Sequence, residues 1–323
     1  MLADTHGRQV GYLRLSLTPA CPMRCTYCRP RVITDMPGEQ RMSAATIEQM
    51  VRHLVTRWGL RKVRLTGGEP TVRRDLLEII ERLSRLDGLR DLAMTTNGLT
   101  LPQHAASFRR AGLHRVNVSL DSLRPQTFER MTGVKGPGRV IAGIHAAMEA
   151  GLQPIRLNTV VLAGENDAEL QELVRFAAAR GLEIRFIELM PMGPLADQWA
   201  DRYVPESAMR DRLNPIVRAW RPLDQGHDSA RRFVVDLDDG HQATVGFITP
   251  MSCNFCAACN RLRLTAGGDV YPCLMDRPRG NVMPALTPDF DADRFDQLLR
   301  DALEAKAPEH PVTGFTTMTV LGG

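Results

Sequence analysis

The first two thirds of this 323-residue chain alternate short apolar strands with amphipathic helices, and this alternation limits the possible folds more than any other feature. Six strands are predicted, at residues 12–17, 62–66, 91–96, 115–120, 155–162 and 183–189. Strand–helix units in series predict a parallel sheet with right-handed crossovers. Such a sheet is a TIM-type barrel if it closes fully or partly, and a doubly wound sheet if it stays open.

Side chains within the predicted strands alternate between apolar and polar residues, which helps to choose between these two folds. Leu13 and Leu15 fall on one face of the first strand, whereas Arg14 falls on the other. The same alternation puts Arg64 and Arg156 on polar faces. A doubly wound sheet is covered on both faces and has nearly continuous apolar strands. The pattern therefore favours a closed or partly closed α/β barrel of six strand–helix units, whose interior holds a polar, anionic ligand.

Apolar residues at helical spacing predict helices between these strands. One helix is predicted between residues 47 and 58, after Ser43 as a candidate N-cap and before Gly59. The same spacing recurs at 140–148 and at 170–177.

Three cysteines follow the first strand with the spacing C-x3-C-x2-C, namely Cys21, Cys25 and Cys28. Soft thiolates gathered on one loop suit an iron–sulfur cluster, and a four-iron cluster takes four ligands. Three cysteines therefore leave one iron open to bind a small molecule. A structural zinc site is the alternative, but such a site is usually closed by four ligands, commonly in C-x2-C pairs.

Further polar or glycine-rich segments fall at the ends of the predicted strands. They are Gly67-Gly68-Glu69-Pro70, Thr95-Thr96-Asn97-Gly98, Ser119 with Asp121, and Met190-Pro191-Met192-Gly193. Barrels of this type place their active sites at the carboxyl ends of the strands. Paired glycines can be an ordinary tight turn, but beside several other polar strand ends they favour a close approach of backbone to a ligand.

The strand–helix pattern fades near residue 195, and prolines predict a linker or long connection from 195 to 230. Two β-hairpins are predicted after it. The first spans 232–248 with a turn at Asp238-Asp239-Gly240, and the second spans 262–273.

Four further cysteines lie around the second hairpin, namely Cys253, Cys256, Cys259 and Cys273. Four thiolates suffice for a closed zinc site, whereas the last three alone would hold an iron–sulfur cluster with one open iron. Arg261 and Arg263 come two and four positions after Cys259, and they share one face of a short predicted strand. Two guanidinium groups beside a metal site favour an anionic substrate over a purely structural ion.

Length and charge restrict the remaining possibilities. The chain is long for a single core, and we assign residues 1–215 to the partial barrel and 216–323 to a cysteine-rich C-terminal region of β-hairpins. The net charge of +4 gives no argument for binding nucleic acid or a membrane. We find no apolar stretch of membrane-spanning or signal-peptide type, so we expect a cytoplasmic protein whose cysteines bind metal rather than form disulfides.

Both cysteine groups and their surroundings resemble those of the GTP 3′,8-cyclase family. Members of this family are radical S-adenosylmethionine (SAM) enzymes that begin molybdenum cofactor biosynthesis. The resemblance covers nearly the whole chain and is carried by residues 13–16, 25–28, 64–70, 95–98, 118–123, 186–193, 255–265 and the terminal Gly322-Gly323. The first cysteine motif marks the superfamily. The second cysteine group, with its Asn-Arg-x-Arg sequence, and the Gly-Gly end mark the cyclases.

The resemblance implies an incomplete (β/α)6 TIM-type barrel of the radical SAM kind, with SAM and two 4Fe–4S clusters as cofactors. It assigns the SAM cluster to Cys21, Cys25 and Cys28, and the second cluster to Cys256, Cys259 and Cys273. The implied SAM contacts are Tyr27, Gly68, Ser119 and Met190. The implied GTP contacts are Arg14, Arg64, Thr95, Arg156, Arg261 and Arg263. Catalysis is assigned to the SAM-cluster cysteines together with Arg261 and Arg263.

The implied reaction, of the lyase class, converts GTP to (8S)-3′,8-cyclo-7,8-dihydroguanosine 5′-triphosphate. A 5′-deoxyadenosyl radical from SAM would remove the ribose C3′ hydrogen, and the C3′ radical would attack C8 of guanine. An electron and a proton would complete the product. The family further implies an electron donor such as flavodoxin or ferredoxin, the downstream cyclic pyranopterin monophosphate synthase, and a monomer or homodimer.

Three features depart from the family pattern. Arg156 replaces the usual lysine, which changes the hydrogen-bond geometry of that cation. The loop that leads to Cys25 lacks the usual Asp-x-Cys-Asn sequence, and Cys253 is an additional thiol that is either a fourth ligand or a bystander. The residues alone leave two other functions open, a radical SAM enzyme that modifies a peptide and a zinc-bearing nucleotide-binding regulator.

Overall fold

The computed structural model describes residues 2–28, 41–311 and 321. Six parallel strands form the centre of the fold: β1 (Tyr12–Ser16), β2 (Lys62–Thr66), β3 (Asp91–Thr96), β4 (Arg115–Ser119), β5 (Arg156–Val161) and β6 (Glu183–Glu188). These are the six strands predicted from the sequence, and their bounds differ from the prediction by at most one residue at either end. The predicted parallel sheet is therefore confirmed.

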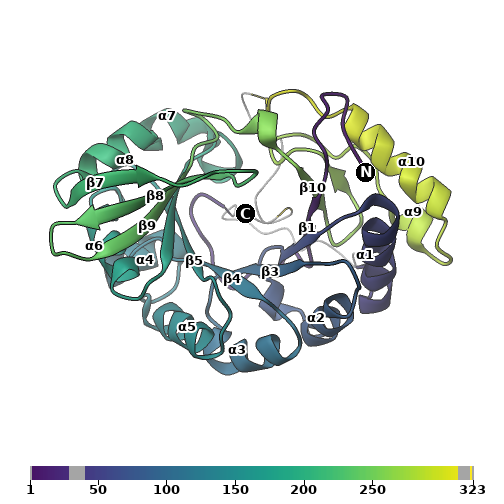
Figure 1. The fold of residues 1–323 in the computed structure, drawn as a ribbon, viewed down its shortest axis with the longest axis horizontal. Helices are drawn as coiled ribbons and strands as arrows, with labels where there is room; N and C mark the ends of the chain where they lie inside the picture. Colours follow the sequence, from purple (N-terminus) through teal and green to yellow (C-terminus); the bar gives the residue numbers. More distant parts are fainter. Residues whose placement is uncertain (1, 29–40, 312–320, 322–323) are drawn as a thin grey trace.

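The connections between these strands contain α1 (Ala44–Trp58), α2 (Leu76–Ser84), α3 (Leu101–Arg110), α4 (Pro125–Thr132), α5 (Gly138–Glu149) and α6 (Leu170–Ala178), with α4 and α5 both between β4 and β5. These helices lie on the outer side of the curved sheet, which does not close into a complete ring in the described residues (Figure 1). The side chain of Ser43 accepts a hydrogen bond from the backbone N–H of Thr46 at 3.0 Å, and Gly59 ends α1 with φ of 73°. Both predicted ends of this helix are confirmed.

The alternation within the strands separates the core from the interior of the barrel. Leu13 and Leu15 of β1 are fully buried in the main hydrophobic core, and truncation of either to alanine would destabilise the fold by about 2–5 kcal/mol. Arg14 and Arg64 point to the other face, where they line a central cavity. The strands thus place apolar residues against the helices and cations inside the barrel, as the sequence predicts.

The C-terminal part of the chain adds strands to both edges of this sheet: β7 (Val217–Pro222), β8 (Ala230–Leu237), β9 (Gln242–Ile248), β10 (Arg261–Leu264) and β11 (Val270–Tyr271). In the described residues the strand order is β11-β10-β1-β2-β3-β4-β5-β6-β9-β8-β7. β10 pairs in parallel with β1, and β9 pairs in parallel with β6. The two predicted hairpins are β8–β9 and β10–β11, both antiparallel.

The prediction of a linker or long connection from 195 to 230 is wrong for much of that segment. It contains α7 (Trp199–Arg202), α8 (Glu206–Leu213) and β7. Pro205 is the N-cap of α8, and Pro222 is the last residue of an edge strand. At both positions the missing N–H of proline is tolerated, so these prolines do not interrupt regular structure.

Two helices, α9 (Met283–Leu286) and α10 (Ala292–Glu304), follow the last strand. Short 3-10 helices occur at Pro70–Val72, Gly193–Gln198 and Cys256–Ala258. Within the described ranges, none of the helices combines the length and the apolar character needed to traverse a bilayer. The terminal Gly322-Gly323 lies outside the described residues.

Candidate active site

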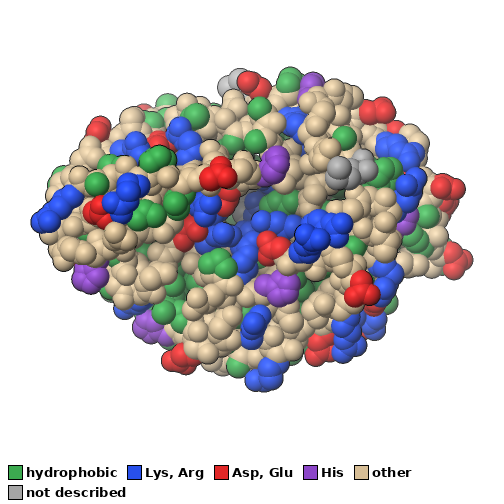
Figure 2. Space-filling model, viewed as in Figure 1, with side chains coloured by type: hydrophobic (Ala, Val, Ile, Leu, Met, Phe, Trp, Pro, Cys, Tyr) green, Lys and Arg blue, Asp and Glu red, His purple; other side chains and the backbone are tan. Residues whose placement is uncertain are grey.

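A cavity of about 440 Å³ lies at the centre of the barrel. Figure 2 shows lysine and arginine side chains gathered in a hollow on this face of the molecule. The cavity is lined by every SAM and GTP contact predicted from the sequence: Tyr27, Gly68, Ser119, Met190, Arg14, Arg64, Thr95, Arg156, Arg261 and Arg263. It is also lined by Cys21, Cys25 and Cys28. The fold therefore brings together residues that are up to 249 positions apart in the sequence.

The strand register sets the cations of the cavity wall in two rows. Arg14 of β1 pairs with Arg64 of β2 on one side and with Arg263 of β10 on the other. Two residues earlier, Tyr12 pairs with Lys62 and Arg261 in the same way. Neighbouring strands are about 4.8 Å apart, so these positive charges are crowded along the wall.

Burial and crowding shift the pKa values of the side chains in these two rows. Burial, together with the cation of Arg263, lowers the pKa of Arg14 to about 9, and burial lowers the pKa of Arg64 to about 9. Although burial raises the pKa of the Tyr12 hydroxyl, the cations of Arg64 and Arg14 lower it to about 8. The two arginine shifts show that these cations are buried, and the Tyr12 shift shows that their charges act on the interior, which an anionic ligand would stabilise.

Several buried polar atoms of the wall have no hydrogen-bond partner within the described part of the chain. They include Nε of Arg64, Oγ1 of Thr95, Oδ1 of Asn158 and Oδ1 of Asn260, all from residues that line the cavity. Buried polar groups in folded proteins are nearly always paired. The wall is therefore suited to a ligand that carries both hydrogen-bond donors and acceptors.

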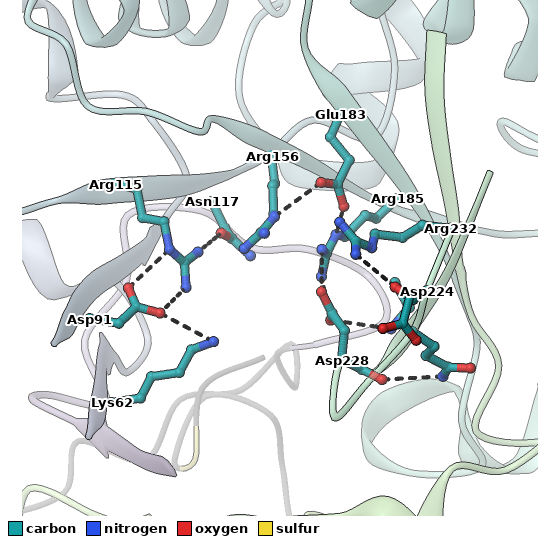
Figure 3. A network of polar contacts seen from close by, with 12 residues as sticks. Lys62, Asp91, Arg115, Asn117, Arg156, Glu183, Arg185, Asp224, Asp228 and Arg232 are labelled. Carbon is teal, nitrogen blue, oxygen red and sulfur yellow. Dashed lines mark hydrogen bonds and ion pairs between the residues drawn. The ribbon is translucent and has the colours of Figure 1, made fainter. Parts of the chain in front are cut away.

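A network of ion pairs continues the wall beyond these rows (Figure 3). Arg185 of β6 donates to both carboxylate oxygens of Asp228, at 2.9 and 2.7 Å. It also pairs with Glu183, which in turn accepts from Nε of Arg156 at 3.2 Å. Despite burial, the guanidinium of Arg185 holds the pKa of Asp228 well below its usual range. Further along the sheet, Arg115 of β4 pairs with Asp91 of β3 at 2.6 Å.

Sequence reasoning missed several of these residues. Lys62 precedes Arg64 by two positions, so the period-two pattern that selected Arg64 is a signal that could have found it. The same pattern could have found Tyr12, which precedes Arg14 by two positions. Asp228 lies in the loop between β7 and β8, where no periodic pattern points to the cavity.

The first cysteine loop is fastened to the barrel by backbone hydrogen bonds. The N–H of Arg24 donates to the carbonyl of Thr132 at 2.8 Å, and the N–H of Thr26 donates to the carbonyl of Met131 at 2.9 Å. Tyr27 donates its hydroxyl proton to Asp121 at 2.7 Å, while burial raises the pKa of Asp121 to about 6. The loop is thereby held over the carboxyl ends of β1 and β4.

The three thiols of this loop lie close to one another. Burial, the carboxylate of Asp121 and the thiols of Cys28 and Cys21 raise the pKa of Cys25 well above its ordinary value. The amide of Asn97 points to Cys21, with 3.9 Å between Nδ2 and Sγ. Mutual repulsion of this kind is relieved when thiolates share a cationic metal centre.

Gly67 and Gly68 allow the first cysteine loop to approach β2. A Cβ on Gly68 would lie 2.4 Å from the carbonyl oxygen of Pro19, and one on Gly67 would lie 2.4 Å from that of Thr18. The N–H of Gly68 donates to Thr18 at 2.7 Å. Close backbone packing therefore accounts for both glycines, and Gly68 additionally lines the cavity.

Glu69 ties the end of β2 to the end of β3. Its buried carboxylate accepts hydrogen bonds from the backbone N–H of Asn97 at 2.6 Å and from the hydroxyl of Thr96 at 2.8 Å. It also accepts from the backbone N–H and the hydroxyl of Thr71. This one carboxylate therefore orients Asn97, the residue that faces Cys21.

The second cysteine group lies beside β10. The lining residues of the cavity given by the described chain do not include Cys256, Cys259 or Cys273, but they do include the chain neighbour of each, namely Phe255, Asn260 and Leu274. Cys256, Cys259 and Cys273 are partly buried, whereas Cys253 is exposed. Burial raises the pKa of Cys256, and the nearby thiols of Cys273 and Cys259 contribute in the same direction. Although burial raises the pKa of Cys259, the cations of Arg261 and Lys306 lower it below its ordinary value.

Both cysteine groups supply the donor set of an iron–sulfur cluster. Cys21, Cys25 and Cys28 are partly buried on one loop, and Cys256, Cys259 and Cys273 are partly buried beside β10 and β11. Soft thiolates are the usual ligands of a four-iron cluster, and three of them leave one iron open.

Two family models together match most of the chain. Residues 15–177 match the model of the radical SAM superfamily, and residues 182–312 match the model named Molybdenum Cofactor Synthesis C. The first match contains the three cysteines at the cavity, and the second contains Cys253, Cys256, Cys259 and Cys273.

Curated relatives match the chain over nearly its whole length. A GTP 3′,8-cyclase from Pelotomaculum thermopropionicum is 40% identical over 314 residues, covering 96% of this chain and 95% of the relative. One from Erythrobacter litoralis is 40% identical over 96% of this chain and 92% of the relative. A crystal structure of Streptococcus suis SuiB bound to precursor peptide SuiA has a TM-score of 0.64 at 16% identity, covering 92% of this chain and 67% of that chain, which shows a shared fold.

Proposed function

Because the chain belongs to the GTP 3′,8-cyclase family of radical SAM enzymes, we propose that it converts GTP to (8S)-3′,8-cyclo-7,8-dihydroguanosine 5′-triphosphate, the first step of molybdenum cofactor biosynthesis. One observation carries the proposal: the three cysteines of the radical SAM motif and six predicted GTP contacts line the same cavity. A site with crowded cations favours a polyanionic nucleotide over an extended peptide.

We assign the SAM cluster to Cys21, Cys25 and Cys28. When bound, this cluster and SAM supply a 5′-deoxyadenosyl radical, which can remove a hydrogen atom from an unactivated carbon. Tyr27, Gly68, Ser119 and Met190 are the proposed SAM contacts. The bond from Tyr27 to Asp121 and the four hydrogen bonds to Glu69 support rigid positioning of this end of the cavity.

We assign the binding of GTP to Arg14, Arg64, Thr95, Arg156, Arg261 and Arg263. Guanidinium groups bind phosphate oxygens through paired, charge-assisted hydrogen bonds. Lys62 lines the same wall and supplies a further cation. These contacts would hold the ribose and base in one orientation, with water excluded from the reacting carbon by the buried wall.

The proposed ligands of the second cluster are Cys256, Cys259 and Cys273. β10 carries Arg261 and Arg263 directly after Cys259, and both arginines line the cavity. This continuity supports a role for the second cluster at the base end of the substrate, with Arg261 and Arg263 as catalytic contacts.

We further infer a setting in which these clusters can be assembled and reduced. None of the seven cysteines forms a disulfide in the described residues, which supports a reducing, cytoplasmic compartment. A flavodoxin or ferredoxin as electron donor, cyclic pyranopterin monophosphate synthase as the consumer of the product, and a monomer or homodimer complete the proposal. The proposed division at residues 215 and 216 separates two regions that share one sheet.

The test is an anaerobic incubation of reduced, cluster-replete protein with SAM and GTP. We expect 5′-deoxyadenosine and a cyclised guanosine nucleotide in equal amounts, and neither cyclised product nor stimulated SAM cleavage with ATP. Formation of 5′-deoxyadenosine that does not depend on GTP, with no cyclised nucleotide, would overturn the substrate assignment.

A further inference from the structure

A short segment after α10 packs against the second cysteine group. Nζ of Lys306 lies 3.8 Å from Sγ of Cys259, 3.4 Å from the carbonyl oxygen of Cys259 and 3.1 Å from that of Arg261. Four residues later, His310 makes a backbone hydrogen bond to Cys256. The segment therefore touches two of the three proposed cluster ligands.

The N-terminal residues hold this segment in place. Arg8 donates from Nη1 to the carbonyls of Cys256 at 3.0 Å and Pro308 at 2.8 Å, and from Nη2 to the carbonyl of Ala307 at 2.7 Å. A ring nitrogen of His6 lies 3.1 Å from the carbonyl oxygen of Lys306. Arg8 thus links the cysteine loop to the segment that carries Lys306, across about 300 residues of sequence.

The charges of these two cations are balanced differently. Arg8 forms a buried ion pair with Asp4 at 2.5 Å. Lys306 is only 3% exposed, yet no carboxylate of the described residues lies within ion-pair distance of its ammonium group. The carboxylate of Asp4 acts on Lys306 only from beyond contact distance, and a buried ammonium group that no negative charge contacts is strongly unfavourable. The sulfur of Cys259 is the contacting atom that can carry negative charge.

We propose that Lys306 is a positioning residue that sets the reduction potential of the second cluster. The ammonium group donates a hydrogen bond to the Cys259 sulfur, and its positive charge stabilises the reduced cluster, which carries one more negative charge. Hydrogen bonds to the ligating sulfurs and local charge are the main means by which a protein tunes such potentials. This inference rests on the second cluster of the proposed function.

The test compares Lys306→Met with wild type in holoenzyme that carries both clusters. Redox titration followed by EPR, with dithionite as reductant, gives the midpoint potential of each cluster, and a Cys25→Ser variant identifies the signal of the second. We expect Lys306→Met to move the second midpoint to a more negative value by at least about 59 mV, a tenfold change in a one-electron equilibrium. The first midpoint should not move.

The chain offers matched controls because it contains only three lysines, Lys62, Lys135 and Lys306. Lys135 is exposed, so Lys135→Met removes the same charge without changing the midpoint. Lys306→Arg retains the positive charge, so its second midpoint should stay close to the wild-type value. An unchanged second midpoint in a Lys306→Met protein that keeps about eight irons and cyclises GTP overturns this inference and leaves the proposed function intact.

A second measurement covers a Lys306→Met variant that fails to assemble its cluster. Wild-type protein labelled with 15N at the lysine side chains should show a 15N coupling to the reduced second cluster in pulsed EPR, and Lys62→Met should retain it. Absence of that coupling in wild type overturns the inference. Wild type with about four irons, or with zinc in the second group, overturns the second cluster and this inference together.

Discussion

Arg14 and Arg64 occupy paired positions on adjacent parallel strands, and both side chains face the same cavity. Burial of two neighbouring guanidinium groups is unfavourable unless an anion joins them. The cavity wall is therefore arranged for a ligand rather than for maximum stability of the ligand-free protein.

Replacing Arg64 by methionine should change stability and affinity in opposite directions. The ligand-free protein should become more stable, because a buried positive charge is removed at similar side-chain volume. Binding of GTP should weaken roughly 10- to 100-fold, because a charge-assisted hydrogen bond contributes about 1.5–3 kcal/mol. Thermal unfolding with and without GTP measures both effects. A variant that is less stable without ligand would show that Arg64 has a structural partner.

Gly68→Ala should disrupt the first cysteine loop. The added Cβ would lie 2.4 Å from the backbone oxygen of Pro19, so either the loop or β2 must move. We expect a loss of about four irons per chain, as one cubane contains, and a loss of reductive SAM cleavage. The control is Gly11→Ala, whose Cβ would meet no atom of the described residues within 4 Å. Full iron content in Gly68→Ala would contradict this account of the loop.

Cys253→Ser and Cys256→Ser should behave differently despite their C-x2-C spacing. Cys253 is exposed, whereas Cys256 is partly buried beside Cys259 and Cys273. Cys253→Ser should retain about eight irons per chain and cyclise GTP, and Cys256→Ser should retain about four and form no cyclised product. Iron analysis and product analysis of both variants test this. Equal loss of iron in the two variants would mean that four thiolates close the second site.

The pair of Arg185 and Asp228 should make stability depend on pH. The pKa of Asp228 is lower in the folded state than in the unfolded chain, so its contribution is fully present at neutral pH. That contribution is lost progressively as the pH falls below about 4, where the unfolded carboxylate takes up a proton first. Asp228→Asn should therefore lower the free energy of unfolding at pH 7 by about 1–3 kcal/mol.

Urea unfolding of wild type and Asp228→Asn at a series of pH values measures this difference. It should shrink as the pH approaches and passes below 4. Asp87→Asn, at an exposed position, supplies the control for loss of one carboxylate. A difference that stays constant across this range would assign the effect of Asp228 to packing rather than to charge.

The sequence was most informative where structure depends on local periodicity. The six barrel strands follow from apolar runs, and Arg64 and Arg156 reach the cavity because side chains alternate along each strand. The prediction for residues 195–230 was wrong because Pro205 and Pro222 were taken as interruptions of regular structure. Pro205 instead begins α8 as its N-cap, and Pro222 is the last residue of β7. Local pattern cannot distinguish a proline that interrupts an element from one that bounds it.

Contacts between distant segments escaped sequence reasoning for a different reason. Arg8 meets Ala307 and Pro308, and Lys306 meets Cys259, without any repeat or spacing that links them. Asp228 reaches Arg185 from a loop for the same reason. Such pairs form only when segments that are distant in sequence meet in the folded chain, and no local pattern predicts which segments will meet.

The pairing of β1 with β10 also bears on the synthesis of the protein. The two strands are far apart in the chain, so β1 has no neighbour on that side until residues 261–264 have left the ribosome. At about 5–20 residues per second, the segment between them takes on the order of 12–50 s to translate. During that time the wall beside Cys21 is incomplete, so the moment at which the barrel interior forms is governed by the ribosome as well as by folding.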